Sequence, residues 1–183
     1  MIKIKLFFRG LTIDLLMCYL LPNDKITAIA VREQIKIMKK PQLRKSCIIM
    51  GDFNSIVDID LDKQGGNRHT IYQNATIRWL IDNNFTDTYR FCNPSKKEYT
   101  WHNNRTQTEA VATRIDQIWT QDDLDHYIID ACIIDADLIT NSDYRIMITT
   151  INSANLINNH KPTKLKNKGP KRKSYKYDNF VTF

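Results

Sequence analysis

IIMGDFN, residues 48–54, joins an apolar run to a glycine, a carboxylate and a carboxamide. The apolar run at 46–50 is short, which favours a buried strand over a buried helix. Asp52 and Asn54 would then close this strand, two residues apart. An aspartate in such a place is also typical of an Asx turn, in which its side chain bonds to the backbone two residues on. The stretch therefore predicts a strand that ends in polar side chains.

The segments before this strand predict a hairpin and a helix. Residues 2–21 begin with apolar and basic residues in alternation, so they suit a strand hairpin better than a signal peptide. Residues 24–40 suit a helix that ends just before a proline. Its buried stripe would run through Ile26, Ala30 and Ile37.

A second helix and several short strands are predicted further along the chain. Residues 71–84 have apolar side chains at helical spacing and end at two asparagines. This order of elements predicts an α/β fold in which sheets pack together and helices cover them. The β-rich runs that follow the second helix lie at 85–91, 98–102, 113–119, 127–135 and 144–151.

The positive charge of the chain is concentrated near its C-terminal end. The 183 residues carry a formal net charge of +7, and eight Lys or Arg lie at 160–176 without an acidic residue. Residues 1–159 are formally neutral. We therefore expect a domain at 1–155 and a basic tail at 156–183 that is disordered in isolation.

The tail allows three interpretations. It is a solubilising terminus, a nuclear-import signal around PKRK, or an arm that binds nucleic-acid phosphates through Lys171, Arg172 and Lys173. No apolar run is long enough to cross a membrane, so no membrane partner is expected. The four cysteines lie far apart without metal-ligand spacing, which favours free thiols in a reduced, intracellular compartment. The sequence carries no signal of an oligomeric state.

Polar side chains lie at the ends of three predicted strands. Asp52 and Asn54 follow the first, Arg114 and Asp116 lie in TRIDQIW, and Asp143 precedes the last. Each has an ordinary structural explanation: an Asx turn, an ion pair, and a turn before a strand. Together they would bring carboxylates and an amide to one rim of a sandwich.

Clustered carboxylates repel one another and are costly unless a cation lies among them. Oxygen ligands without His or Cys suit a hard divalent ion, Mg²⁺ or Mn²⁺, better than zinc. A metal, a carboxylate base and an amide donor together suit the attack of water on a phosphoester. The strand ends therefore predict a metal-dependent phosphoesterase.

GDFN, TRIDQIW and NSDYRIM, in this order and spacing, resemble the endonuclease/exonuclease/phosphatase superfamily. YLLPN, FTDTYRF and YTWHNN are similar to further stretches of that superfamily, and the resemblance covers roughly residues 12–151. It is nearest in appearance to the endonuclease domain of long interspersed retrotransposons. The fold that it implies is a truncated four-layer α/β/β/α sandwich of the deoxyribonuclease I-like type.

The resemblance also implies a role for each strand-end residue. Asp52 would orient or deprotonate the attacking water, and Asn54 would donate to a phosphate oxygen. Asn23, in YLLPN, would help to hold the phosphate. Asp116 would orient a catalytic histidine, and Asp143 would help to hold Mg²⁺ or Mn²⁺.

Two neighbouring residues are given structural roles instead. We expect Trp101 to pack rather than to touch nucleic acid. Arg114 is expected to pair with an acid or the backbone rather than with substrate.

Tyr144 departs from the pattern, because the superfamily has Ser-Asp-His where this chain has Ser-Asp-Tyr. A phenol is neutral near pH 7 and offers one hydrogen bond but no positive charge. Losing such an electrostatic group typically costs about two to three orders of magnitude in rate. None of the four histidines lies in that motif.

The start of the chain is a second departure. The superfamily has an N-terminal half-sheet, with an asparagine and a metal-binding glutamate, before the strand that ends in YLLPN. The three glutamates of this chain do not close an early strand. We therefore expect a weakened metal site and an exposed sheet edge or apolar face.

These features predict a DNA endonuclease-like phosphodiesterase fragment, weak or inactive as it stands. A phosphomonoesterase or sphingomyelinase-like member of the same superfamily is the first alternative. A noncatalytic nucleic-acid-binding remnant that uses the basic tail is the second.

Overall fold

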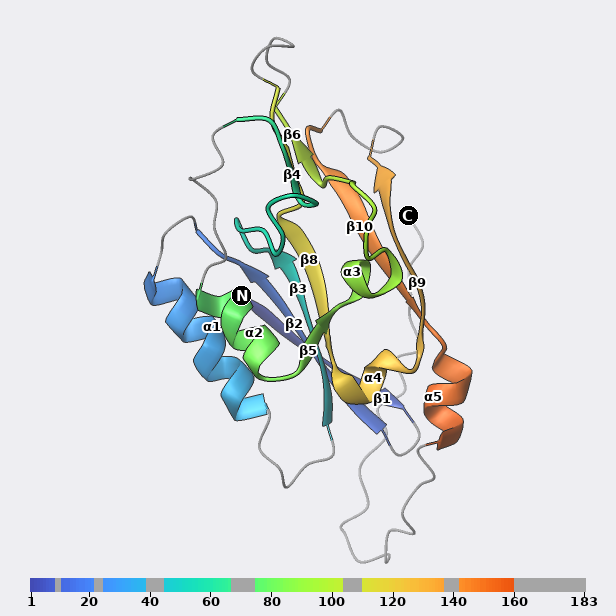
Figure 1. The fold of residues 1–183 in the computed structure, drawn as a ribbon. Helices are drawn as coiled ribbons and strands as arrows, with labels where there is room; N and C mark the ends of the chain where they lie inside the picture. The colour runs from blue at the N-terminus through green and yellow to red at the C-terminus, as the bar shows by residue number, and fades with distance from the viewer. Residues whose placement is uncertain are drawn as a thin grey trace, which may run out of the picture.

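The computed structural model describes residues 1–8, 11–21, 25–38, 45–66, 75–103, 110–136 and 142–159. Their fold is mixed α/β, as the sequence predicts, and is built on three sheets (Figure 1). The largest sheet has the strand order β1-β2-β3-β8-β5, in which only β2 and β3 are parallel neighbours. Its strands are β1 (Ile2–Phe8), β2 (Leu11–Tyr19), β3 (Lys45–Asp52), β8 (Asp116–Gln121) and β5 (Phe85–Asp87).

The two smaller sheets are antiparallel. One is a pair of long strands, and the other has the order β4-β7-β6. The pair consists of β9 (Ile128–Asp135) and β10 (Arg145–Ile151), and the three-stranded sheet of β4 (Lys63–Gln64), β7 (Ala112–Thr113) and β6 (Trp101–His102).

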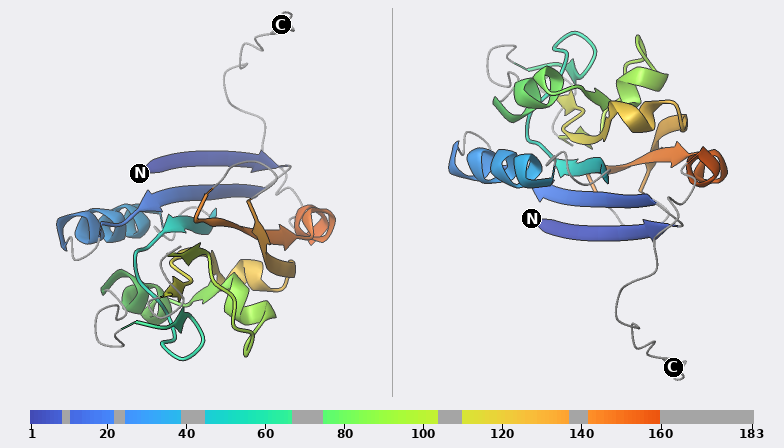
Figure 2. Two further views of the ribbon diagram at one scale, coloured as in Figure 1. Left: turned by 90° about the horizontal axis from the view of Figure 1, so that it is seen from above. Right: turned by 90° about the horizontal axis from the view of Figure 1, so that it is seen from below.

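Different elements cover the two faces of the large sheet, because successive strand residues point to opposite faces. On β3, Ile49 packs into a core with residues of α1 (Lys25–Met38) and α2 (Ala75–Asp82). The adjacent Ile48 packs into a second core with Leu124 and Leu156. Figures 1 and 2 show α1 and α2 on one side of the molecule and β9, β10 and α5 on another. The remaining helices are α3 (Thr88–Cys92), α4 (Asp122–Asp125) and α5 (Ser153–Asn159).

Most predicted elements are confirmed, and two details are wrong. The run at 85–91 is a three-residue strand followed by α3, because the Asp87 carboxylate caps that helix and accepts from the N–H groups of Tyr89 and Arg90. The stripe on α1 does not run through Ile26, which is 80% exposed, or through Ala30; Val31 is buried instead. The predicted ion pairing of Arg114 is confirmed.

The outer edge of the large sheet exposes apolar side chains, as the sequence predicts. β1 is the edge strand, and Ile2, Ile4, Leu6 and Phe7 are all exposed. Lys3 and Lys5 alternate with them, which is a common way to discourage pairing at an edge. Among the described residues no helix is long and apolar enough to cross a membrane.

The predicted boundary at residue 155 falls within α5, whose Leu156 is buried. The tail from residue 160 onward lies outside the described residues. The division into a domain and a tail therefore stays a prediction.

Candidate functional site

The end of β3 is shaped by the close approach of β2. Gly51 has a φ of 140°, and a Cβ at this position would lie 1.8 Å from the carbonyl oxygen of Cys18. Any larger residue would push the two parallel strands apart. The glycine in GDFN is thus required by the packing of the backbone immediately before Asp52.

Asp52 and Asn54 form the turn that follows. The Asp52 Oδ1 accepts a 2.7 Å hydrogen bond from the Asn54 N–H, and Asn54 has a positive φ of 44°. The Asn54 Nδ2 donates to the carbonyl of Leu20 at 2.8 Å, and the Leu20 N–H donates to the carbonyl of Asp52 at the same distance. The two residues therefore fix the end of β2 against the end of β3, and each keeps polar atoms beyond these bonds.

Asp116 lies directly opposite Asp52. The two residues are Cα partners in the antiparallel ladder of β3 and β8. The ladder continues through a 2.9 Å bond from the Phe53 N–H to the carbonyl of Ile115. Side chains of partnered residues project to the same face of a sheet, so the two carboxylates are neighbours.

Tyr144 and Asp143 join the pair through β6. Trp101 forms a bridge with Tyr144, and the His102 N–H donates to the carbonyl of Asp143 at 3.1 Å. Tyr144 is 43% exposed, and Asp143 is exposed as well. The structure thus brings Asp52, Asn54, Asp116 and the Asp143–Tyr144 pair to neighbouring backbone positions from three strands.

Burial raises the pKa values of both carboxyl groups in the Asp52–Asp116 pair. Burial, with a smaller contribution from the charge of Asp52, raises the pKa of Asp116 to about 6, although a hydrogen bond with Thr100 opposes the change. Burial also raises the pKa of Asp52, against the effect of the Asn54 N–H. The Oδ2 atom of Asp116 is buried and has no hydrogen-bond partner among the described residues. Among the described residues, this pair of acids has no cationic partner.

Tyr19 belongs to the same cluster and was not predicted. It is the Cα partner of Asp52 on β2 and is 56% exposed. Burial and then the charges of Asp52 and Asp116 raise the pKa of Tyr144, and Tyr19 and Asp143 contribute in the same direction. The sequence signal for Tyr19 was its place at the end of β2, immediately before LLPN.

The remaining predicted site residues are not placed here. Asn23 and the basic residues Lys171, Arg172 and Lys173 lie outside the described part of the chain. His102 lies on β6, where its ring packs edge-on against the ring of Tyr99. Burial and the charge of Arg145 lower its pKa.

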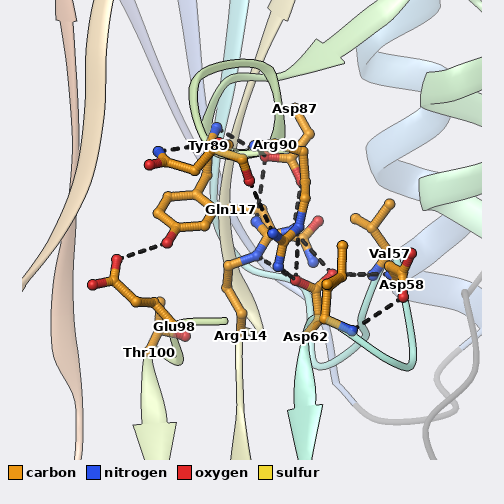
Figure 3. A network of polar contacts seen from close by, with 12 residues as sticks. Val57, Asp58, Asp62, Asp87, Tyr89, Arg90, Glu98, Thr100, Arg114 and Gln117 are labelled. Atoms are coloured by element: carbon orange, nitrogen blue, oxygen red, sulfur yellow. Dashed lines mark hydrogen bonds and ion pairs between the residues drawn. The ribbon is translucent and has the colours of Figure 1, made fainter. Parts of the chain in front are cut away.

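Arg114, two residues before Asp116, is the centre of a second cluster (Figure 3). It is fully buried, and its Nε donates to Asp62 Oδ1 at 2.8 Å. Its Nη2 donates to Asp87 Oδ2 at 2.6 Å. Burial favours the neutral form of Asp62, but the charge of Arg114, together with hydrogen bonds from Arg114, Arg90 and the Asp58 N–H, keeps the pKa of Asp62 below its ordinary value.

Further bonds connect this second cluster to neighbouring loops. Asp62 also pairs with Arg90 and accepts from the N–H groups of Val57 and Asp58. Tyr89 packs beneath the Arg114 guanidinium, 5.2 Å from its ring centre, and donates to Glu98 at 2.6 Å. Figure 3 shows these side chains converging from separate segments. The second cluster therefore has matched charges and a structural role.

The cluster of Asp52, Asp116 and Asp143 offers the oxygen ligands that a hard divalent cation prefers. In the described part of the chain, too few of these ligands converge to hold the ion by themselves. Asp52, Asp116 and Asp143 supply oxygen atoms, and the buried Asp116 Oδ2 has no partner of its own. Within the described residues, however, no three His, Cys, Asp or Glu side chains converge closely enough to hold a metal ion. A cation at this site would need ligands from water, from substrate or from residues beyond those described.

No family model and no curated protein matches the sequence. Solved structures do match the fold. A 3'-5' exonuclease from Neisseria meningitidis, NExo, is 18% identical with a TM-score of 0.61, over 82% of this chain and 64% of that chain. Another structure, of the 3' phosphatase NExo from Neisseria, holds a product DNA hairpin.

Two further structures agree with this result. An AP endonuclease from Archaeoglobus fulgidus is 17% identical with a TM-score of 0.58, over 76% of this chain and 62% of that chain. The endonuclease domain of TRAS1, a telomere-specific non-LTR retrotransposon, is 19% identical with a TM-score of 0.59, over 82% of this chain and 63% of that chain. The chain thus spans less than two thirds of the length of each of these proteins.

The chain therefore shares its fold with these exonuclease, AP endonuclease and retrotransposon endonuclease structures, as the sequence motifs predict. At these identities the likeness is one of fold.

Proposed function

We propose that the cluster at the strand ends is the site of a metal-dependent phosphodiesterase that acts on DNA, and that its activity is weak or absent in the present chain. The observation that carries this proposal is the pairing of Asp52 with Asp116, whose buried Oδ2 has no partner. Apart from the turn that Asp52 forms with Asn54, two facing carboxylates without a counter-charge add little stability, since an apolar pair in their place would cost less. Such a site suits a bound cation or a proton transfer.

Asp52 is the residue proposed to accept the proton of the attacking water. It lies at a strand end with one oxygen engaged by the Asn54 N–H, so the other oxygen can take part in chemistry. The second N–H of the Asn54 carboxamide can donate to a phosphate oxygen, because within the described residues Nδ2 donates to one partner, the carbonyl of Leu20. Asn23 is proposed to help hold that phosphate.

Tyr144 is proposed to donate one hydrogen bond to the phosphate where the superfamily has an imidazole. Its raised pKa keeps the phenol protonated near pH 7, so it brings no positive charge to the developing negative charge. Asp116, its acidic neighbour, would therefore lack the cationic partner that it orients in the superfamily. This substitution is one reason to expect a slow enzyme.

Mg²⁺ or Mn²⁺ is the proposed cofactor, held in part by Asp143 and the Asp52–Asp116 pair. When bound, such an ion supplies Lewis-acid stabilisation of the phosphate. The small number of convergent ligands among the described residues is the second reason to expect slow turnover.

DNA is the proposed substrate class, supported by the product hairpin bound to the Neisseria enzyme of the same fold. The basic residues at 160–176 would add affinity by displacing counterions from phosphates, and we propose a nuclear location on the strength of PKRK. The alternatives are phosphomonoester or sphingomyelin hydrolysis at the same cluster, and DNA binding without turnover.

One set of assays separates these candidates. The purified chain and its Asp52→Ala variant are incubated with supercoiled plasmid, an inositol phosphate and sphingomyelin, with Mg²⁺ or Mn²⁺ and with a chelator. We expect slow, metal-dependent nicking of the plasmid that Asp52→Ala abolishes. Release of phosphate or phosphocholine without nicking favours the first alternative. DNA binding in a mobility-shift assay without turnover of any substrate favours the second.

A further inference from the structure

Thr100 lies where the strands that carry the acidic cluster meet. It is fully buried and immediately precedes β6. Its Oγ1 accepts two hydrogen bonds of 3.1 Å, from the N–H groups of Ile115 and Asp116. Its own N–H donates to the carbonyl of Thr113 at 3.0 Å. The side chain of one residue thus fixes the first residue of β8.

The carbonyl of Thr100 fixes the other half of the cluster. It accepts a 2.7 Å hydrogen bond from the Arg145 N–H, at the start of β10. The next residue, Trp101, bridges to Tyr144. The relative positions of Asp116 and Tyr144 are therefore set through a single peptide segment, with Thr100 bonded to both strands.

The hydroxyl of Thr100 makes one further contact within the described residues, a long hydrogen bond of 3.5 Å that it donates to the carbonyl of Thr113. A buried hydroxyl that accepts from two consecutive backbone N–H groups and also donates to the neighbouring strand does more than fill space.

We propose that Thr100 is a positioning residue of the strand-end cluster, whose hydroxyl holds Asp116 and whose carbonyl holds the strand of Tyr144 at a fixed separation. The inference rests on the proposed function for what the cluster does. The contacts of Thr100 themselves exist whether or not the chain turns over a substrate. A valine of the same size would fill this space but could not accept from the Ile115 and Asp116 N–H groups.

Thr113 provides a matched control. It is also a buried threonine, 1% exposed, and it lies on the neighbouring strand β7. Its Oγ1 has no hydrogen-bond partner among the described residues. Thr113→Val therefore removes a buried hydroxyl of the same kind without removing a bond to Asp116.

The test compares Thr100→Val, Thr100→Ser and Thr113→Val in the full chain, by NMR measurement of amide hydrogen exchange at Ile115 and Asp116. We expect Thr100→Val to speed exchange of both amides at least about tenfold, because each loses its hydrogen bond to the hydroxyl. Thr100→Ser should restore both exchange rates, and Thr113→Val should change neither.

Two results would overturn the inference. One is unchanged amide exchange at Ile115 and Asp116 in folded Thr100→Val, and the other is an equal acceleration in Thr113→Val. If Thr100→Val does not fold, Thr100→Cys replaces it, since sulfur is a weak acceptor, and the same two results apply. Amide exchange needs no nuclease activity, so failure of the proposed function would leave this test intact.

Discussion

Two pairs of aspartates in this chain have opposite electrostatic environments. Asp62 and Asp87 are almost fully buried, and Arg114 donates to both carboxylates. Asp52 and Asp116 are partly buried and face each other without a cation among the described residues. The pKa of Asp62 is lowered, whereas that of Asp116 is raised to about 6. The burial of an acid therefore does not indicate its role. The presence or absence of a positively charged partner does.

The difference separates structure from function within one sheet. The pair with a counter-charge, Asp62 and Asp87, connects loops through Arg114 and so stabilises the fold. The uncompensated pair costs stability, and proteins retain such groups where a ligand or a proton transfer uses them. The following predictions test whether this contrast is real.

Removing the counter-charge of the first pair should have the largest effect. Arg114→Met leaves Asp62 and Asp87 buried without their partner, and we expect it to lower the free energy of unfolding by about 3–5 kcal/mol. Arg145→Met is the control, because Arg145 pairs with Asp135 at 2.6 Å while their side chains are 38% and 62% exposed. It should cost about 0–1 kcal/mol in urea denaturation. Equal losses would show that the buried cluster is not special.

The pH dependence of stability should carry opposite signs for the two pairs. Because the pKa of Asp116 is raised in the folded chain, folding favours its protonated form. Its contribution to the free energy of unfolding is therefore full below the unfolded pKa of 3.8 and is lost as pH rises to about 6. Asp116→Asn stays neutral, so it should be more stable than the unmodified chain at neutral pH by about 3 kcal/mol, and the gain should vanish below about pH 4.

Asp62 supplies the contrast in the same experiment. Its pKa is lowered, so its contribution is present above 3.8 and is lost only as pH falls below that value. Thermal denaturation of the unmodified chain and Asp116→Asn across this range measures both effects. An Asp116→Asn protein that parallels the unmodified chain at every pH would contradict the assignment of an uncompensated acid.

A divalent cation should stabilise the uncompensated pair and leave the compensated one unaffected. At a Mn²⁺ concentration tenfold above its dissociation constant, linkage gives about 1.4 kcal/mol, visible as a rise in the unfolding midpoint. Asp52→Asn should reduce this rise, and Asp130→Asn, an exposed acid on β9, should not. A rise that survives Asp52→Asn would place the cation elsewhere.

Local patterns in the sequence predicted much of the fold but less of the site. Alternation along β1 and the apolar run of β3 identified strands, because these signals are short-range. The helix α3 was missed although Asp87 offered a capping signal, since the aromatic residues around it favour strands. The positions of element ends followed from capping and turn residues where these were recognised.

The two clusters depend on contacts that no local pattern encodes. Asp62 meets Arg114 across 52 positions of sequence, so nothing near TRIDQIW indicated which acid would pair with it. Asp52 and Asp116 were placed together by motif order, while their register follows from the sheet. Tyr19 was overlooked because its role comes from lying beside Asp52 on a parallel strand, which its own sequence neighbours do not reveal.

The central claim is that Asp52 and Asp116 form a hydrolytic centre limited by Tyr144, and Mg²⁺-dependent plasmid nicking by Tyr144 variants tests it most directly. An imidazole beside Asp116 can carry charge to the phosphate, but it does not supply missing metal ligands. We therefore predict that Tyr144→His nicks about fivefold faster than the unmodified chain, roughly 1 kcal/mol of transition-state stabilisation. Adding Asp52→Ala should abolish nicking in both backgrounds. A folded Tyr144→His protein that nicks equally well with and without Asp52→Ala would contradict the account.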